Sequence, residues 1–98
     1  MKYNFRTVTA NTSATIDDHV IGVDTSSISI RVQLPSAASV RRGFLLTIKD
    51  IAGGASVNNI TIVRGNSDTI DGATTITQNS NYGTVRLFSN GNHTWHVY

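Results

Sequence analysis

The 98-residue sequence contains no cysteine and no glutamate, and it has only one proline and four leucines. The absence of cysteine excludes a disulfide scaffold, a thiolate metal site and a cysteine nucleophile. The lack of glutamate and the scarcity of leucine argue against a helical bundle or coiled coil, because these folds depend on good helix formers. Apolar runs extend over only a few residues, far short of the roughly 20 needed to cross a bilayer, and residues 1–6 lack the apolar segment of a secretion signal. The sequence therefore predicts a soluble protein with no membrane partner.

Threonine, serine and asparagine are abundant, with 13, 10 and 9 copies, and valine and isoleucine together number 19. β-branched residues favour pleated strands, and asparagine and serine favour the tight turns that join strands. The composition therefore favours an all-β fold.

Charge is sparse and nearly balanced, with a formal net charge of +2 from eight Lys and Arg and six Asp. The basic residues are spread along the chain, and only Arg41 and Arg42 are adjacent. A nucleic-acid-binding surface normally shows a denser basic stripe with interleaved aromatic residues. We therefore expect no nucleic-acid partner.

Hydrophobic alternation marks the strands. In residues 28–34, Ile28, Ile30, Val32 and Leu34 alternate with polar side chains, and Pro35 ends the pattern. Shorter or weaker patterns predict further strands at 3–9, 19–23, 44–51, 60–64, 73–77, 84–89 and 94–98, with the segment 44–51 buried on both faces. We expect one helical turn within residues 36–42, capped by Ser36.

Turn signals rich in Gly, Asn and Asp separate these segments at intervals typical of a β-sandwich or small roll. The sequence predicts a single antiparallel domain of seven to eight strands over residues 1–98, with residues 1–9 as an N-terminal strand or arm that engages a neighbouring subunit. A chain of this size has a thin core and no disulfides, so oligomerisation is the expected source of further stability.

Candidate catalytic groups are few. Besides the six Asp, only His19, His93 and His96 offer a general base, and three-residue spacing on a strand points His93 and His96 to opposite faces. Asp68 and Asp71 lie beside Gly72, where their carboxylates either stabilise a turn or contribute to a calcium site. We expect no catalytic residues, no metal site and no cofactor.

The single tryptophan, Trp95, lies near His96 and Tyr98 at the end of the chain. Such a cluster suits the core, a subunit interface or a carbohydrate platform, and these three alternatives remain open from the sequence. The Arg41–Arg42 pair is either a solvated loop or a contact for an acidic protein surface.

Six sequence segments occur in an order and spacing that resemble a known β module. They are IGVDT at 21–25, IRVQLPSAA at 30–38, TIKDI at 47–51, NNITI at 58–62, DTIDG at 68–72 and NYGTVRL at 81–87. This order resembles a module of tailed-phage virion proteins that occurs near the C-termini of tail fibres and tailspikes and in small capsid decoration (cement) proteins. The resemblance covers roughly residues 15–98.

The resemblance implies a homotrimeric structural protein of a virion with no enzymatic activity. The chain begins at Met1 without a fibrous shaft, which favours a decoration protein made in the bacterial cytoplasm that binds the major capsid protein on the outer capsid surface and stabilises the shell. The alternative is a tail-fibre or tailspike tip that trimerises and binds a host glycan.

Two groups of contact residues follow from these expectations. The predicted capsid contacts lie in the N-terminal segment, which would extend a neighbour's sheet, and in the arginine pair: Met1, Lys2, Tyr3, Phe5, Arg6, Arg41 and Arg42. The predicted trimer or receptor contacts are aromatic: Trp95, Tyr98 and Tyr82.

Overall fold

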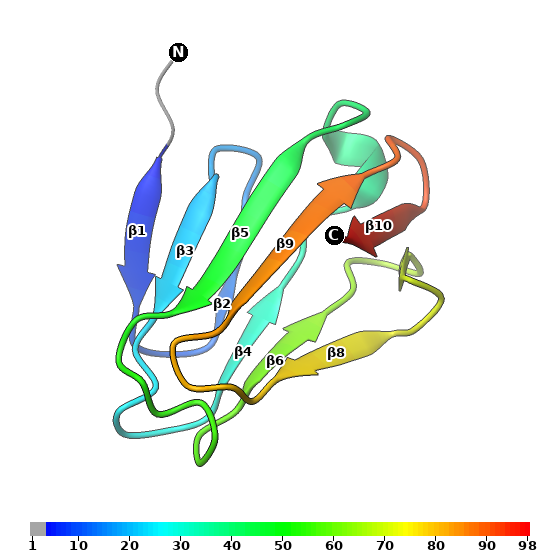
Figure 1. The fold of residues 1–98 in the computed structure, drawn as a ribbon. Coiled ribbons are helices and arrows are strands. Elements are labelled where there is room, and N and C mark those ends of the chain that lie inside the picture. Colours follow the sequence, from blue (N-terminus) through cyan, green and yellow to red (C-terminus); the bar gives the residue numbers. More distant parts are fainter. Residues whose placement is uncertain (1–3) are drawn as a thin grey trace.

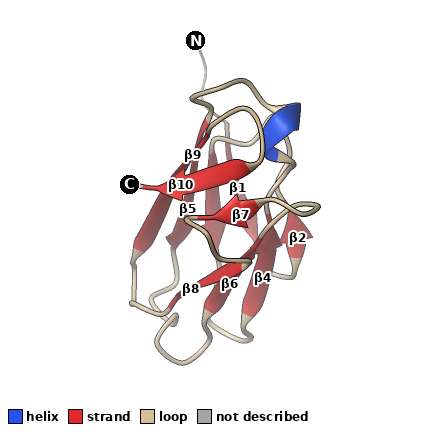
Figure 2. Ribbon diagram, turned by 90° about the vertical axis from the view of Figure 1, so that its right-hand side faces the viewer, coloured by secondary structure: helices blue, strands red, loops and turns tan. Residues whose placement is uncertain are grey.

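The computed structural model describes residues 4–98 and consists of ten strands, their connecting turns and one three-residue 3-10 helix, η1 (Ala37–Ser39). The strands form two sheets (Figures 1 and 2). The six-stranded sheet has the order β1 (Phe5–Val8), β3 (Val20–Val23), β5 (Leu45–Asp50), β9 (Thr84–Ser89), β10 (Thr94–Val97) and β7 (Thr69–Ile70). The four-stranded sheet has the order β2 (Thr12–Ser13), β4 (Ile30–Gln33), β6 (Ile60–Val63) and β8 (Thr75–Gln78).

The all-β prediction is confirmed. Eight strands overlap the eight segments expected from hydrophobic alternation, while β2 and β7 are additional. These two strands have two residues each, too few for an alternating pattern to be visible in the sequence. In the part of the chain described, no helix is long and apolar enough to cross a membrane.

The prediction of an antiparallel fold is wrong, because both sheets are mixed. From β1 to β8 the chain alternates between the two sheets, so β3 returns beside β1, β4 beside β2, β5 beside β3 and β6 beside β4, all in parallel. Between the strands of residues 4–98, pairing is antiparallel where β9 joins β5 and β10 and where β8 joins β6. The crossover that parallel neighbours require is supplied here by a strand of the opposite sheet rather than by a helix.

The core lies between the two sheets and follows the two-residue period of the strands. On β4, Ile30 and Val32 are buried, whereas Arg31 and Gln33 are exposed. The facing sheet contributes fully buried side chains from five strands, including Ile21, Leu46, Ile48, Leu87, Ile70 and Trp95. Burying one such aliphatic side chain contributes about 1.5–3 kcal/mol, so this layer is the main source of stability.

Strand β5 departs from the expectation of burial on both faces. Leu46, Ile48 and Asp50 are buried, but Leu45 is 49% exposed. The reason is that the four-stranded sheet covers only one face of the six-stranded sheet. The other face, called here the outer face, carries alternate residues of the same strands into solvent.

One end of the core is closed by the segment around η1. The Trp95 Nε1–H donates to the Pro35 carbonyl at 3.1 Å, and the Ser89 hydroxyl donates to the Ala37 carbonyl at 2.9 Å. Ser36 does not cap this turn with its side chain as expected; its carbonyl instead accepts hydrogen bonds from the backbone N–H and hydroxyl of Ser39. Trp95 therefore anchors η1 to the sheet.

A close contact at the opposite end of β5 gives a first test of the structure. Gly53 has a φ of +80°, and a Cβ added there would lie 2.4 Å from the Tyr82 ring. Gly72 has a similar φ of +84° but open space around the same position. Both alanine substitutions incur the cost of the left-handed backbone, but only Gly53→Ala also displaces the ring.

We expect Gly53→Ala to lower the free energy of unfolding by about 0.5–1.5 kcal/mol more than Gly72→Ala, the cost of moving the exposed Tyr82 ring off its rotamer. Denaturant unfolding of the two variants measures this difference directly. Equal losses would show that Tyr82 does not pack on Gly53 in solution.

Candidate functional site

The predicted capsid contacts of the N-terminal segment are only partly described. Met1, Lys2 and Tyr3 lie outside residues 4–98. Phe5 begins β1, the edge strand of the six-stranded sheet, and its side chain is 60% exposed on the outer face, where its ring lies over Gly22 of β3. Phe5 is therefore available to a partner.

Arg6 is bound within the chain. Its guanidinium pairs with both carboxylate oxygens of Asp18, at 2.8 and 3.1 Å, and also donates to the Ser13 carbonyl. Burial raises the pKa of Asp18, but the hydrogen bonds from Arg6 and from the Thr15 backbone outweigh this effect and hold that pKa below its ordinary value. Arg6 thus fixes the loop between β2 and β3, which leaves less of its charge free for a partner.

Arg41 and Arg42 follow η1 and precede β5. Neither guanidinium has a hydrogen-bond or ion-pair partner within residues 4–98. A Cβ added to Gly91, which has a φ of +76°, would lie 3.0 Å from the Arg42 Cβ. The lack of a side chain at Gly91 lets the β9–β10 turn pack directly against the backbone of Arg42. This contact places Arg42 beside that turn.

The three predicted aromatic contacts do not form one cluster. Trp95 is fully buried and bound to Pro35, so the expectation that it contacts a trimer partner or receptor does not fit its position. Tyr82 packs on Gly53 before the start of β9, whereas Tyr98 is 51% exposed beside Phe88 and Arg86 on the outer face. Of the three alternatives that the sequence leaves open for Trp95, the complete burial of its side chain favours the core.

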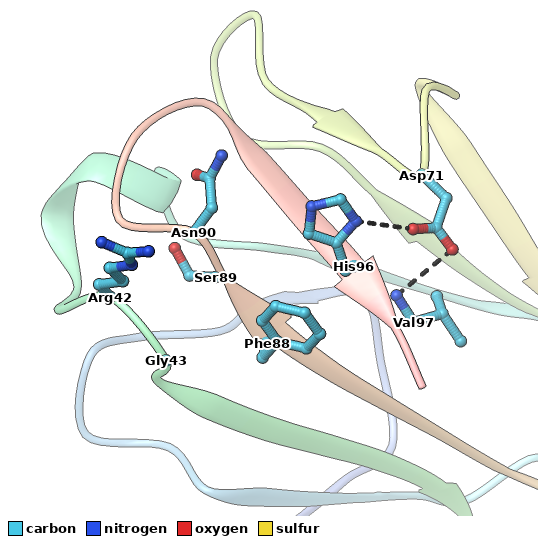
Figure 3. A pocket seen from close by; sticks show the side chains of 8 residues that line it. All are labelled: Arg42, Gly43, Asp71, Phe88, Ser89, Asn90, His96 and Val97. Atoms are coloured by element: carbon cyan, nitrogen blue, oxygen red, sulfur yellow. Dashed lines mark hydrogen bonds and ion pairs between the residues drawn. The ribbon is translucent and has the colours of Figure 1, made fainter.

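An open pocket of about 480 Å³ lies at the end of β9 and β10 (Figure 3). Its lining residues come from four segments: Arg42 and Gly43 before β5, Phe88, Ser89 and Asn90 at the end of β9, Asp71 just after β7, and His96 and Val97 of β10. Backbone hydrogen bonds join these segments. For example, the Gly43 N–H donates to the Ser89 carbonyl at 2.8 Å, and the Asp71 N–H donates to the Trp95 carbonyl at 2.9 Å. The lining segments of the pocket are therefore held together by backbone hydrogen bonds.

His96 and Asp71 form the polar side of this pocket. The Asp71 carboxylate lies 3.1 Å from His96 Nδ1 and also accepts the Val97 backbone N–H at 3.3 Å. The His96 ring is 5.2 Å from the Phe88 ring, centroid to centroid. Figure 3 shows the other nitrogen of His96, Nε2, directed over Phe88 toward Asn90.

Asp68 and Asp71 act in turns and do not share a site. Asp68 is buried and accepts the Ala37 backbone N–H at 2.7 Å, with His93 Nδ1 3.8 Å away, whereas Asp71 is directed to His96 at the surface. No group of three or more His, Cys, Asp or Glu side chains that would hold a metal ion occurs among residues 4–98.

The sequence interpretation missed most of the pocket. Phe88 and Asn90 were assigned only to a strand and a turn, and Arg42 was separated from the C-terminal aromatic residues by about 50 positions. Their convergence depends on the pairing of β5 with β9 and of β10 with β7, which no local pattern reveals. The Asn90–Gly91 dipeptide was the one available signal, since it marks the turn on which Arg42 rests.

Comparison with protein-family models and with curated proteins found no match to this chain. The virion module therefore remains a proposal.

Proposed function

We propose that the chain is a phage capsid decoration protein that acts as a homotrimer on the outer capsid surface. The observation that carries this proposal is an exposed apolar strip on the outer face of the six-stranded sheet, next to the open edge of β1. Its apolar residues come from three adjacent strands. They are Phe5 of β1, its direct cross-strand neighbour Val20 of β3, and Leu45 of β5, which lies two residues before Thr47, the β5 partner of Val20.

The strip has the properties of an association surface. Phe5 and Leu45 are 60% and 49% exposed, and Val20 pairs directly with Phe5 across the strands. Within residues 4–98, β1 pairs with β3 alone, so its other side is an open sheet edge to which another strand can add. Apolar side chains beside an unpaired edge favour pairing with another chain, and burying them against copies of the same chain would compensate for the thin core.

The mechanism is associative. A trimer that bridges neighbouring capsid subunits binds the assembled lattice and not its separated parts, so mass action stabilises the shell. Three linked copies raise the apparent affinity without tight single contacts. The proposed capsid contacts are the guanidiniums of Arg41 and Arg42, which have no partner within residues 4–98 and suit an acidic surface, whereas the apolar strip that contains Phe5 is assigned to the contact between copies.

This function predicts an outcome for particles stripped of the protein. Adding the purified chain back is expected to restore their resistance to heat, whereas an Arg41→Asp, Arg42→Asp double variant is expected to restore much less. An Arg31→Asp, Arg64→Asp double variant changes the charge equally and serves as the control. Stripped particles that are already as heat-resistant as complete ones would contradict the proposal.

A second candidate function is favoured by the pocket at the end of β9 and β10. In the tail-fibre alternative, this pocket and the neighbouring Tyr98 would contact a host glycan. The supporting observation is the combination of the half-buried Phe88 ring with polar groups from Arg42, Asn90 and His96 around it (Figure 3).

A further inference from the structure

The pocket at the end of β9 and β10 has two unpaired hydrogen-bond donors. The Arg42 guanidinium has no partner in the described part of the chain. The Asn90 Oδ1 accepts the backbone N–H groups of Asn92 and Thr94, at 2.9 and 3.1 Å, and this fixes the amide so that Nδ2 is left to donate. The pocket therefore offers one cation and one neutral donor to a ligand.

His96 provides the complementary acceptor. An ionised carboxylate only accepts hydrogen bonds, so the contact with Asp71 places the proton of the neutral imidazole on Nδ1. The free Nε2 then carries a lone pair, and a ligand hydroxyl donates to it. The 3.1 Å contact with Asp71 and the packing on Phe88 fix the orientation of the His96 ring.

The remaining surface is apolar and of limited size. The half-buried ring of Phe88 lies between the rings of His96 and Tyr98, at centroid distances of 5.2 and 5.8 Å. A volume of about 480 Å³ holds one or two sugar rings. The C–H face of a pyranose packs on an aromatic ring while its hydroxyls remain free for hydrogen bonds.

We infer that this pocket binds an acidic sugar, a pyranose that carries a carboxylate. Arg42 and Asn90 would face the carboxylate, a ligand hydroxyl would donate to His96 Nε2, and Phe88 would support the ring. A carboxylate without hydroxyls, such as an acidic side chain of a protein, would leave the His96 lone pair unmatched. The inference rests on the second candidate function and gives its ligand a chemical class.

The test is a titration of the ¹⁵N-labelled protein with glucuronate, glucose and acetate, followed by NMR. Glucuronate is expected to shift the amide signals of Gly43, Asn90 and Gly91 and to saturate in the millimolar range, as suits one monosaccharide. Glucose and acetate are each expected to bind at least tenfold more weakly.

Three variants assign the roles of the groups. Arg42→Ala is expected to weaken glucuronate binding roughly tenfold and to leave glucose binding nearly unchanged, because it removes a charge-assisted hydrogen bond. His96→Phe keeps an aromatic ring but is expected to weaken both sugars. Arg31→Ala removes the same charge from the four-stranded sheet and is expected to change neither.

The contrary outcomes are distinct. Equal affinity for glucuronate and acetate would overturn the sugar assignment, because the site would then recognise only a carboxylate. Equal affinity for glucose and glucuronate would overturn the acidic assignment and leave a glycan-binding tip in place. No response to any sugar at tens of millimolar would overturn the inference. It would leave the decoration function standing, because that function is tested separately by adding the protein back to stripped particles.

Discussion

Replacing Asp50 with asparagine is expected to cost about 3–5 kcal/mol of the free energy of unfolding, the loss typical of disrupting a buried, hydrogen-bonded charge. Asp50 ends β5 and is fully buried. Its carboxylate accepts five hydrogen bonds of 2.7–3.1 Å from three different loops: from Thr25 Oγ1 and from the backbone N–H groups of Ala52, Gly53, Ala55 and Tyr82. An amide replaces one of the two acceptor oxygens with an NH₂ group, which leaves buried donors unpaired.

The same network predicts a dependence of stability on pH. Burial raises the pKa of Asp50, but the hydrogen bonds from Thr25 and from the backbone of Tyr82, Ala52 and Ala55 outweigh it and hold the pKa well below the ordinary value of 3.8. A carboxylate whose pKa is lower in the folded state contributes its full stabilisation above the unfolded pKa and loses it as the pH falls below that value. We therefore expect the wild-type Tm to fall as the pH decreases below about 4, and to fall less in Asp50→Asn.

Denaturant unfolding at neutral pH and calorimetry between pH 2 and 7 measure both effects. Asp17→Asn is the matched control, because the Asp17 side chain is exposed and has no hydrogen-bond partner in residues 4–98. A loss below about 1 kcal/mol for Asp50→Asn, or an unchanged acid dependence, would show that the three loops are held by other contacts.

Leu45→Asp is expected to convert a trimer into monomers. The proposed interface contains Leu45, Val20 and Phe5 on the outer faces of three adjacent strands. A charge placed in a desolvated apolar interface costs far more than the contact it replaces. A loss of about 2 kcal/mol or more per contact is typical of a central interface residue, so we expect the association constant to fall at least a hundredfold.

Sedimentation at micromolar concentration provides the measurement. The wild type is expected to show the mass of three 10.6 kDa chains and Leu45→Asp the mass of one. Val57→Asp is the control, because Val57 is 82% exposed in the β5–β6 loop and lies outside the strip. A wild type that stays monomeric, or a variant that still trimerises, would exclude this surface as the trimer interface.

Much of the fold could be predicted from local pattern. Alternation in 28–34 correctly placed Ile30 and Val32 in the core and Arg31 and Gln33 in solvent, because a two-residue period is a property of the strand itself. Parallel pairing could not be predicted in this way. Phe5 pairs with Val20 and Val20 with Thr47, offsets of 15 and 27 residues, so the winding has no constant period to detect in the sequence.

The site residues show the same limit: the sequence indicates their positions on strands and turns, but not the contacts they make with distant segments. The sequence leaves the role of Trp95 open, because its hydrogen bond to Pro35 joins residues that are 60 positions apart in the chain. Asp50 appeared as the polar end of a strand before two glycines, and nothing local indicates that three loops converge on it. The pocket also required the pairing of β10 with β7, which brings Asp71 to His96.

An image of the intact particle by electron cryomicroscopy tests the proposed function most directly. The account predicts density for three copies of the chain above points where capsid subunits meet, with the Arg41–Arg42 loop facing the shell. Density for the chain at the end of a tail fibre, and none on the capsid, would contradict the decoration function and support the glycan-binding alternative.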